Sequence, residues 1–450
     1  MKLIYDIKDR PKFPQLLVFA VQQLLAIMAA TLVVPIIIGN GMQPTAALFG
    51  AGLGTLVYVL FTKAKSPVFL GSSFAFLSSM SAAFAGAASI SLGYLGLIIG
   101  ATLAGLVYVV IALIVKFAGV NWIDKLMPKQ VIGPTVSIIG LSLAGNAIGD
   151  LQKGGYQVDN VPTANVFVAI ICGLVALFVT MICSVYGKKM LKLIPFIIGI
   201  LSGYVVAAIF TVIGIATENP SLMVINFGVF NDLKLFTIPE FTFLTAIKGF
   251  KDFDPKYLGT IAMAFVPVAF VVFAEHIADH KNISSIIEKD LLKEPGLHRT
   301  LLGDGVGSIV GSIFGGCPNT TYGESVACVA ITGNASVFTI ITAAIMAIII
   351  AFFDPFVAFV NSIPSCVMGG ICMALYGFIA VSGLKMIQKV DLEDNKNLFT
   401  VSVILIAGIG GLVLNFGDIT ITAIATALIL GIITNIVLSL KKDNKADSNE

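Results

Sequence analysis

The sequence predicts an all-α, multi-pass membrane protein with about fourteen membrane-crossing segments. Of its 450 residues, 57% are hydrophobic and only 12% are charged, whereas soluble domains average about 25% charged residues. Uncharged apolar segments of about 20 residues, the length that a helix needs to cross a bilayer, recur from end to end. Because no soluble core needs this much apolar sequence, we expect the chain to be embedded in a lipid bilayer.

Eleven segments are apolar throughout and predict membrane-spanning helices. They are 15–38, 45–62, 91–117, 130–148, 164–186, 193–215, 258–280, 335–353, 364–384, 397–414 and 419–440. Three further segments, 67–87, 300–316 and 319–333, are weaker because small and polar residues interrupt them. Residues 1–14 are polar and charged, so we expect no cleavable signal peptide and a first apolar segment that stays as a helix.

Lysine and arginine residues predict the orientation. If the N-terminus is cytoplasmic, 22 of the 27 Lys and Arg residues fall on the cytoplasmic side of these segments. The outer loops then hold only Lys153, Lys234, Lys248, Lys251 and Lys256. Cytoplasmic loops of membrane proteins carry such an excess of positive charge. Because the number of segments is even, the sequence predicts a protein of the cytoplasmic (inner) membrane with both termini in the cytoplasm.

A short pattern occurs once in each half of the chain. The stretches PKQVIG (128–133) and PSCVMG (364–369) share Pro-x-x-Val-x-Gly, and each opens a glycine-rich span. The first begins an inside-to-outside helix and the second an outside-to-inside helix, so the halves predict an inverted repeat of seven plus seven spans. Secondary transporters are the class that favours this symmetry.

Two of the weak segments occupy matching places in the two halves. They contain SPVFLGSSFAFLSS (66–79) and GGCPNTTYGES (315–325), which are too polar for plain spanning helices. Irregular backbone at membrane depth survives only where protein buries it or where it lines a cavity. A matched pair of interrupted spans therefore predicts a midplane substrate site, to which Phe74 and Tyr322 add aromatic surface. Ordinary re-entrant loops are the alternative.

Four acidic residues lie within or beside apolar segments. Glu275 and Asp279 are one helical turn apart in 258–280, Glu324 follows the second interrupted segment, and Asp304 lies in the preceding weak segment. Acids at membrane depth are costly and usually functional. A buried carboxyl group can also take up and release a proton near neutral pH. Asp279 also fits a solvated helix end, and Asp304 also fits a structural brace.

Other residue types carry no chemistry in this interpretation. His276 faces away from the acidic pair, and His280 and His298 belong to a basic flank. The six cysteines show no metal-type spacing, so we expect free packing thiols and neither a metal nor a cofactor. The sequence shows no P-loop and no nucleophile paired with a base, so nothing in it predicts an enzyme. The strong spans lack Lys and Arg, which favours a planar neutral ligand with N–H donors, or a coupling cation, over an inorganic anion.

Several stretches resemble the nucleobase–ascorbate transporter (nucleobase:cation symporter-2) family, and within it the bacterial uracil:proton symporters. They are LGSSFAF (70–76), AEHIADH (274–280), EPGLHR (294–299), PNTTYGE (318–324) and VMGG (367–370). The resemblance implies two inverted seven-span repeats, a core domain and a gate domain. It also implies two short antiparallel strands in the interrupted spans, and a homodimer formed through the gate domain.

The resemblance also implies domain boundaries and site residues. The core domain would comprise 1–120 and 258–355, the gate domain 121–218 and 356–440, with an extracellular loop at 219–257 and a cytoplasmic tail at 441–450. By position, Glu275 and Glu324 match glutamates that bind the pyrimidine ring. Phe74 matches an aromatic beside the ring, Tyr322 and Gly323 match strand residues that offer backbone groups, and Tyr376 matches a gate-domain tyrosine facing the site.

Three departures from the family pattern concern the proton path. Asp279 stands where the most similar type has a histidine implicated in proton coupling. Gln22-Gln23 replaces the usual Gln-His, and Ser325 and Ala327 replace the Asn and Gly of the signature. The proton path is therefore expected to differ in detail, with Asp279 as a carrier in place of a histidine.

These observations predict an importer of uracil driven by proton symport through alternating access. Its partners would be the nucleobase, protons, the bilayer and a second copy of the chain, with no nucleic acid. Protons would be carried among Glu275, Asp279, Glu324 and Asp304. The alternatives are a purine (xanthine, urate or guanine) symporter on the same fold, an anion exchanger of related architecture, and a passive channel.

Overall fold

The computed structural model describes residues 3–119, 128–158, 161–188, 190–231, 233–416 and 419–439. The predicted cytoplasmic tail, 441–450, lies outside these residues. The helices are α1 (Phe13–Ile38), α2 (Pro44–Phe61), η1 (Phe74–Phe76), α3 (Leu77–Ala85), α4 (Ile90–Ala118), α6 (Lys129–Ser142), α7 (Ala144–Leu151), α8 (Val166–Tyr186), α9 (Met190–Leu193), α10 (Pro195–Ala216), η2 (Pro220–Leu222), η3 (Phe227–Phe230), α11 (Thr242–Gly249), η4 (Phe250–Asp252), α12 (Pro255–Ile287), η5 (Leu292–Gly296), α13 (Leu297–Gly315), α14 (Gly323–Thr332), α15 (Val337–Ile350), α16 (Asp354–Ser362), α17 (Ser365–Ile387), α18 (Asn395–Ile409) and α19 (Ala423–Ser439).

Six short strands form three two-stranded antiparallel sheets in the described part of the chain. β1 (Leu70–Ser72) pairs with β4 (Asn319–Thr321), β2 (Gln157–Val158) with β3 (Val161–Pro162), and β5 (Leu414–Phe416) with β6 (Ile419–Ile421). The sheet of β1 and β4 joins the two interrupted segments, as predicted. The other two sheets were not predicted.

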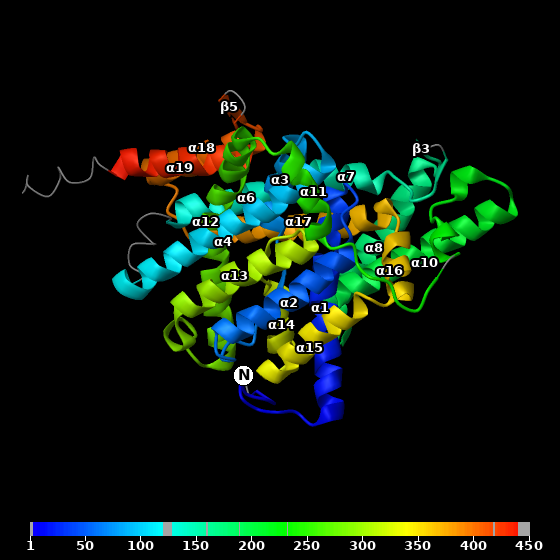
Figure 1. The fold of residues 1–450 in the computed structure, drawn as a ribbon, viewed down its shortest axis with the longest axis horizontal. Helices are drawn as coiled ribbons and strands as arrows, with labels where there is room; N and C mark the ends of the chain where they lie inside the picture. The colour runs from blue at the N-terminus through cyan, green and yellow to red at the C-terminus, as the bar shows by residue number, and fades with distance from the viewer. Residues whose placement is uncertain are drawn as a thin grey trace, which may run out of the picture.

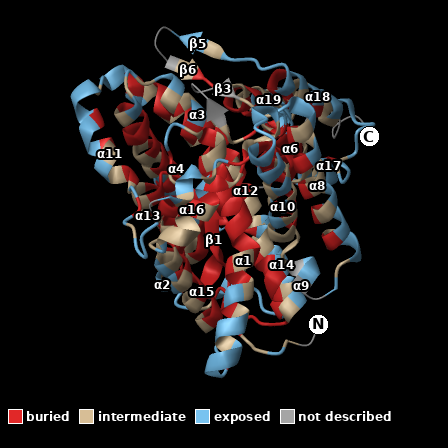
Figure 2. Cartoon of the chain, turned by 90° about the vertical axis from the view of Figure 1, so that its right-hand side faces the viewer, coloured by how far each residue is buried: buried red, intermediate tan, exposed pale blue. Residues whose placement is uncertain are grey.

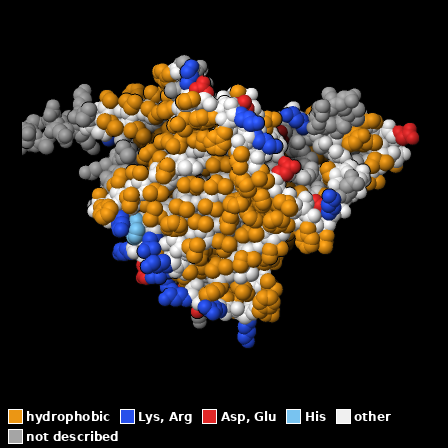
Figure 3. Space-filling model, in the orientation of Figure 1, with side chains coloured by type: hydrophobic (Ala, Val, Ile, Leu, Met, Phe, Trp, Pro, Cys, Tyr) orange, Lys and Arg blue, Asp and Glu red, His pale blue; other side chains and the backbone are white. Residues whose placement is uncertain are grey.

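The membrane assignment is confirmed. Within the residues that the structure describes, eight helical stretches are long and apolar enough to cross a membrane, namely α1, α2, α4, α6 with α7, α8, α10, α12 and α17. Shorter apolar helices include α14, α15, α18 and α19. Hydrophobic side chains cover most of the broad face in Figure 3, where lipid tails would contact the protein. The total of fourteen spans stays a prediction, because these shorter helices have only 10–17 residues.

Several predicted spans have different bounds in the structure: for example, the helix of the span 397–414 ends at Ile409, and that of the span 419–440 begins at Ala423. α12 runs to Ile287, beyond the predicted end at residue 280, because Ile283 and Ile287 are buried and extend its apolar face. It ends where Glu288 adopts a left-handed conformation, with φ of 54°. The predicted span 130–148 consists of two helices, α6 and α7, that meet at Leu143.

The helices pack in two groups. α2 packs against α13 and α15, and α4 packs against α12 and α13. α17 packs against α6, α7 and α8, and α18 packs against α19 and α6. In Figure 1, α2, α13 and α15 lie together in the lower half and α8 and α10 lie together at the right. Each group combines helices from the first and the second half of the chain.

Glycines bring α2 and α13 into backbone contact. A Cβ added at Gly54 would lie 2.6 Å from the carbonyl oxygen of Gly307, and one at Gly50 would overlap the carbonyl oxygen of Gly311. The side-chain amide of Asn319 donates to the Gly50 carbonyl oxygen at 3.0 Å and so ties β4 to this contact. Buried residues fill the centre of the molecule where α1, β1 and α12 lie (Figure 2). This packing fixes the position of the two central strands.

Candidate functional site

A cavity of about 480 Å³ lies beside the paired strands β1 and β4. Its wall is formed by η1, α12, β4 and α14 on one side and by α6, α10 and α17 on the other, with α1 between them. Six of the predicted site residues line it: Phe74, Glu275, Asp279, Tyr322, Gly323 and Glu324. The volume falls in the usual range for small-molecule sites, about 300–1,000 Å³.

Pairing of the two strands gives hydrogen-bond partners to backbone N–H and carbonyl groups of both interrupted segments. Leu70 pairs with Thr321 and Ser72 pairs with Asn319, and the Tyr322 hydroxyl donates to the Ser72 carbonyl oxygen at 2.5 Å. The Leu70 N–H donates to the Thr55 hydroxyl at 2.9 Å. Non-helical backbone can therefore persist at this depth, because its polar groups have protein partners.

α14 begins where the second strand ends, so its N-terminus lies at the cavity wall. Gly323 and Glu324 occupy its first turn. The first N–H groups of a helix have no intrahelical acceptor, and the N-terminal end of the helix dipole is positive. The start of α14 can therefore donate hydrogen bonds to carbonyl oxygens of a ligand, and it stabilises the negative charge of Glu324.

α12 presents two carboxyl groups to the cavity. Glu275 and Asp279 are separated by four residues, which places them on the same face of the helix. The Thr321 hydroxyl donates to Asp279 Oδ2 at 3.0 Å. With Glu324, three acidic side chains face one cavity, so their charges repel one another unless a proton or a ligand separates them.

Two predicted site residues lie outside the cavity wall. Tyr376 is buried behind Phe74, with its ring centroid 6.3 Å from the Phe74 ring and an interplanar angle of 76°. Asp304 is buried in α13, where its Oδ2 lies 2.6 Å from His276 Nδ1. Tyr376 therefore contacts Phe74 edge-on without lining the cavity, and Asp304 contacts His276 of α12.

Sequence reasoning missed the two histidines of α12. His276 and His280 are both buried, and their rings stack with centroids 4.0 Å apart. The assignment of His280 to a basic flank was wrong, because α12 continues as a packed helix past Lys281. The available signal was their spacing of four residues, which repeats the spacing of Glu275 and Asp279 on another face.

Two of the departures from the family pattern contact each other. The Gln23 side-chain amide donates to the Ser325 hydroxyl, which also accepts from the Phe69 N–H at 2.9 Å. This hydroxyl joins α1, the residue preceding β1, and α14. This hydroxyl therefore links two positions at which the chain departs from the family pattern.

We expect the substitutions Gln23→Ala and Ser325→Ala to act on the same interaction. Gln23→Ala removes one of the two donors to the Ser325 hydroxyl. Ser325→Ala leaves the buried Gln23 amide and the Phe69 N–H without this acceptor, which costs about 1–3 kcal/mol of unfolding free energy. The double variant should lose less than the sum of the two losses, because the shared bond can be lost only once. Unfolding of the purified protein in detergent measures this.

Gln23→Ala combined with Ser202→Ala is the control. The Ser202 hydroxyl donates to the Ile198 carbonyl oxygen of its own helix at 2.8 Å, far along the chain from Gln23. Those two losses should add. Strictly additive losses for Gln23→Ala and Ser325→Ala would contradict the shared bond.

No group of three or more His, Cys, Asp or Glu side chains in the described ranges is arranged to bind a metal ion. The cavity does contain one basic side chain, Lys192, in the short helix α9. The wall therefore combines carboxylates, hydroxyls and backbone N–H groups with this one amine.

Known proteins match this chain over nearly its full length. The model of the Permease family, Xan_ur_permease, matches residues 14–416. The chain is 38% identical to the uracil permease of Bacillus subtilis (strain 168), covering 100% of this chain and 98% of that protein. It is 34% identical to the uracil permease of Escherichia coli (strain K12), covering 96% and 94%.

Two solved structures have a similar fold and little sequence in common with this chain. The transmembrane domain of the cyanobacterial bicarbonate transporter BicA has a TM-score of 0.62 and 15% identity, covering 95% of this chain and 99% of that one. The murine Solute Carrier 26 family member A9 anion transporter has a TM-score of 0.65 and 12% identity, covering 96% and 69%. These similarities show a shared fold.

Proposed function

The chain belongs to the Permease family described by Xan_ur_permease, and on that premise we propose that it imports uracil together with protons across the cytoplasmic membrane. The relatives from Bacillus subtilis and Escherichia coli, which are 38% and 34% identical to it, are uracil permeases. The observation that carries the proposal is one cavity lined by three acidic side chains and by the start of a helix.

The cavity complements a planar pyrimidine. Uracil has two N–H donors and two carbonyl acceptors in the plane of one ring. The carboxylates of Glu275 and Glu324 would accept from the N–H groups, and the backbone N–H groups at the start of α14 would donate to a carbonyl. Phe74 would pack against the ring. Hydrogen bonds to charged groups contribute about 1.5–3 kcal/mol each, so two carboxylates favour this ligand strongly.

The two packing groups of helices suggest the moving parts. η1, α12 and α14 on one cavity wall belong to the predicted core domain, and α6, α10 and α17 on the opposite wall belong to the predicted gate domain. Rocking of one group against the other would alternately expose a fixed site to either side of the membrane. The gate domain would also form the homodimer contact.

The acidic side chains would couple uracil transport to proton transport. An empty cavity with three ionised carboxyl groups is electrostatically unfavourable in a low-dielectric environment. Protonation of Glu275, Asp279 or Glu324 would lower that repulsion and permit the movement. The cavity wall includes Ser184 and Lys192, next to loops predicted to be cytoplasmic, so this conformation would release its substrate inward. Lys and Arg side chains gather along the lower left edge of the molecule in Figure 3, as expected of a cytoplasmic face.

We expect cells that lack their own uracil carrier to take up labelled uracil when they express this protein. Uptake should saturate and should collapse with a protonophore, and unlabelled uracil should compete better than xanthine, guanine or urate. The cavity volume alone would admit a second ring, so the competition panel decides between pyrimidine and purine. Uptake of a purine in place of uracil would identify the purine symporter, and unsaturable uptake that ignores the protonophore would identify a channel.

A further inference from the structure

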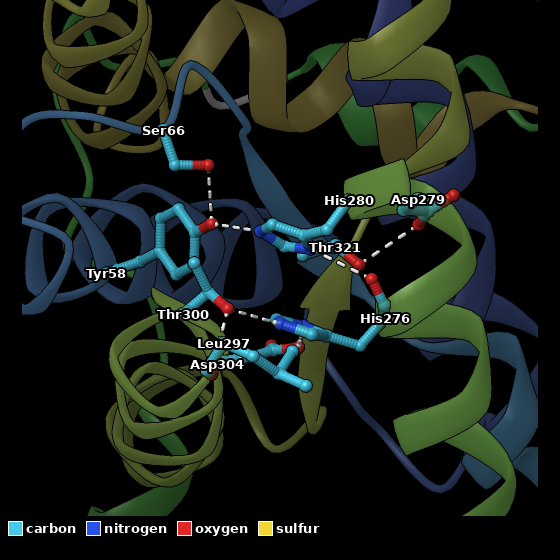
Figure 4. Close-up of polar contacts among 9 residues, drawn as sticks. All are labelled: Tyr58, Ser66, His276, Asp279, His280, Leu297, Thr300, Asp304 and Thr321. Atoms are coloured by element: carbon cyan, nitrogen blue, oxygen red, sulfur yellow. Dashed lines mark hydrogen bonds and ion pairs between the residues drawn. The ribbon is translucent and has the colours of Figure 1, made fainter. Parts of the chain in front are cut away.

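α12 carries acids on one face and histidines on another. Glu275 and Asp279 line the cavity, whereas the rings of His276 and His280 point away from Asp279 toward α13 and α2 (Figure 4). His276 contacts Asp304 and Thr300, and His280 contacts Tyr58. The proposed substrate chemistry uses neither histidine. Their hydrogen bonds limit where the ring protons can lie.

His276 and Asp304 share one proton. The Thr300 hydroxyl donates to the Leu297 carbonyl oxygen at 3.0 Å, so it accepts from His276 Nε2 at 3.0 Å. Nε2 therefore carries a hydrogen. The remaining proton lies between His276 Nδ1 and Asp304 Oδ2, which are 2.6 Å apart. Whichever atom holds this proton, the pair has no net charge.

His280 is different because its hydrogen bonds allow two protonation states. Its Nδ1 lies 2.8 Å from the His276 carbonyl oxygen, which can only accept, so Nδ1 carries a hydrogen. Its Nε2 lies 2.7 Å from the Tyr58 hydroxyl oxygen, which lies 2.7 Å from the Ser66 hydroxyl oxygen. The single hydroxyl hydrogen of Tyr58 can serve only one of these two neighbours.

The two arrangements differ by one proton. When Tyr58 donates to Ser66, Nε2 must donate to Tyr58, and the ring of His280 is a cation. When Tyr58 donates to Nε2, the ring is neutral and Ser66 can donate to Tyr58. A proton that arrives at Ser66 therefore converts one arrangement into the other by moving one hydrogen along each hydroxyl. Ser66 is buried, but Lys63 and Ala64 just before it are exposed.

We infer that His280 is a proton-binding site separate from the cavity, and that Tyr58 and Ser66 exchange its proton with water on the side of Lys63. The charged and titratable groups around it are Tyr58 from α2, His276 and Asp279 from α12, and Asp304 from α13. Tyr108 of α4 lies beyond them, with its ring 6.3 Å from that of His276. Because the His276–Asp304 pair is neutral, the charge of His280 acts chiefly on its chain neighbour Asp279.

The site would control proton release, and in this respect the inference rests on the proposed proton symport. A cation at His280 favours the ionised form of Asp279, so loading His280 lets Asp279 give up the proton that entered with the substrate. Unloading His280 through Tyr58 and Ser66 resets the site. His280 binds and returns the same proton, so no additional proton is consumed in a cycle.

Nitrogen-15 NMR of histidine-labelled protein tests the site directly, because the chain has only three histidines. His280→Gln and His298→Gln variants assign the signals. We expect His280 to hold a hydrogen on Nδ1 alone at about pH 8 and on both nitrogens at about pH 5. A hydrogen on Nε2 alone, or an unchanged ring across this range, overturns the inference. This readout is independent of transport.

Transport measurements separate proton release from binding. In proteoliposomes, exchange of labelled for unlabelled uracil does not require proton release, whereas net proton-driven uptake does. Tyr58→Phe should slow net uptake roughly tenfold or more, because it removes the hydroxyl of the relay, and should leave exchange within about twofold. Equal slowing of both rates, or no slowing of either, contradicts the relay.

Tyr108→Phe is the matched control. It removes the hydroxyl of a buried tyrosine that also packs near His276, and within the described residues that hydroxyl has no hydrogen-bond partner. Both rates should stay within about twofold of the unchanged protein. An equal loss of net uptake in Tyr108→Phe would show that the relay is not the cause. If the unchanged protein exchanges no uracil, the proposed function fails, and the NMR titration still decides whether His280 binds a proton.

Discussion

Replacing Glu275 by glutamine should lower proton-driven uracil uptake by about 100-fold or more. The amide keeps the size of the side chain but cannot ionise, so it neither carries a proton nor forms charge-assisted hydrogen bonds with ring N–H groups. Loss of one such bond costs about 1.5–3 kcal/mol, or about 10- to 150-fold in binding. Loss of the ionisable group adds a defect in coupling.

The measurement is labelled-uracil uptake, normalised to the amount of folded protein that size-exclusion chromatography shows. Uracil-dependent thermal stabilisation, measured separately, shows how much of the loss is binding. Glu393→Gln, an exposed acid outside the cavity, is the matched control and should retain uptake. If Glu275→Gln still takes up uracil and the protonophore still abolishes this uptake, Glu275 is not the proton carrier, and Asp279 becomes the next candidate.

Replacing Gly50 by alanine should destabilise the whole fold. Within a helix this exchange normally stabilises by up to about 1 kcal/mol. Here the added Cβ would overlap the Gly311 carbonyl oxygen and lie 3.2 Å from the Gly315 nitrogen, and both atoms are backbone of α13. Because backbone cannot rotate away as a side chain can, α2 and α13 must separate, at a cost of about 1–3 kcal/mol.

Separation of these helices also reaches the site, because Asn319 donates to the Gly50 carbonyl oxygen. We therefore expect Gly50→Ala to lower the unfolding temperature and to reduce uptake together. Gly145→Ala, in α7, is the control, since its added Cβ meets no atom within 4 Å. A Gly50→Ala protein as stable as the Gly145→Ala protein would contradict the close helix contact.

The sequence was sufficient to predict where the cavity would be. Acids at membrane depth and two interrupted segments are unusual whatever surrounds them, so Glu275, Glu324, the two segments and their aromatic residue Phe74 could be recognised from the sequence alone. The family resemblance then added Gly323 and the pairing of the two segments as antiparallel strands. The four residues Glu275, Glu324, Phe74 and Gly323 lie at the cavity wall, as does strand β4.

Partners distant in the sequence could not be predicted. Whether His280 ends a helix in water or is buried against Tyr58 depends on residues more than 200 positions away. The same holds for Gln23 and Ser325, whose bond spans 302 positions. Tyr376 also lies outside the cavity wall. Packing against other helices sets how α17 is rotated about its axis, and this rotation could not be predicted from one sequence.

The pairing of β1 with β4 has a consequence for biosynthesis. The ribosome releases Ser72 nearly 250 residues before its partner Asn319. At about 5–20 residues per second, β1 waits on the order of 10–50 s for the strand that satisfies its backbone. An unpaired strand is not tolerated in lipid, so the first interrupted segment must remain sheltered by the insertion machinery or by water until the second half arrives.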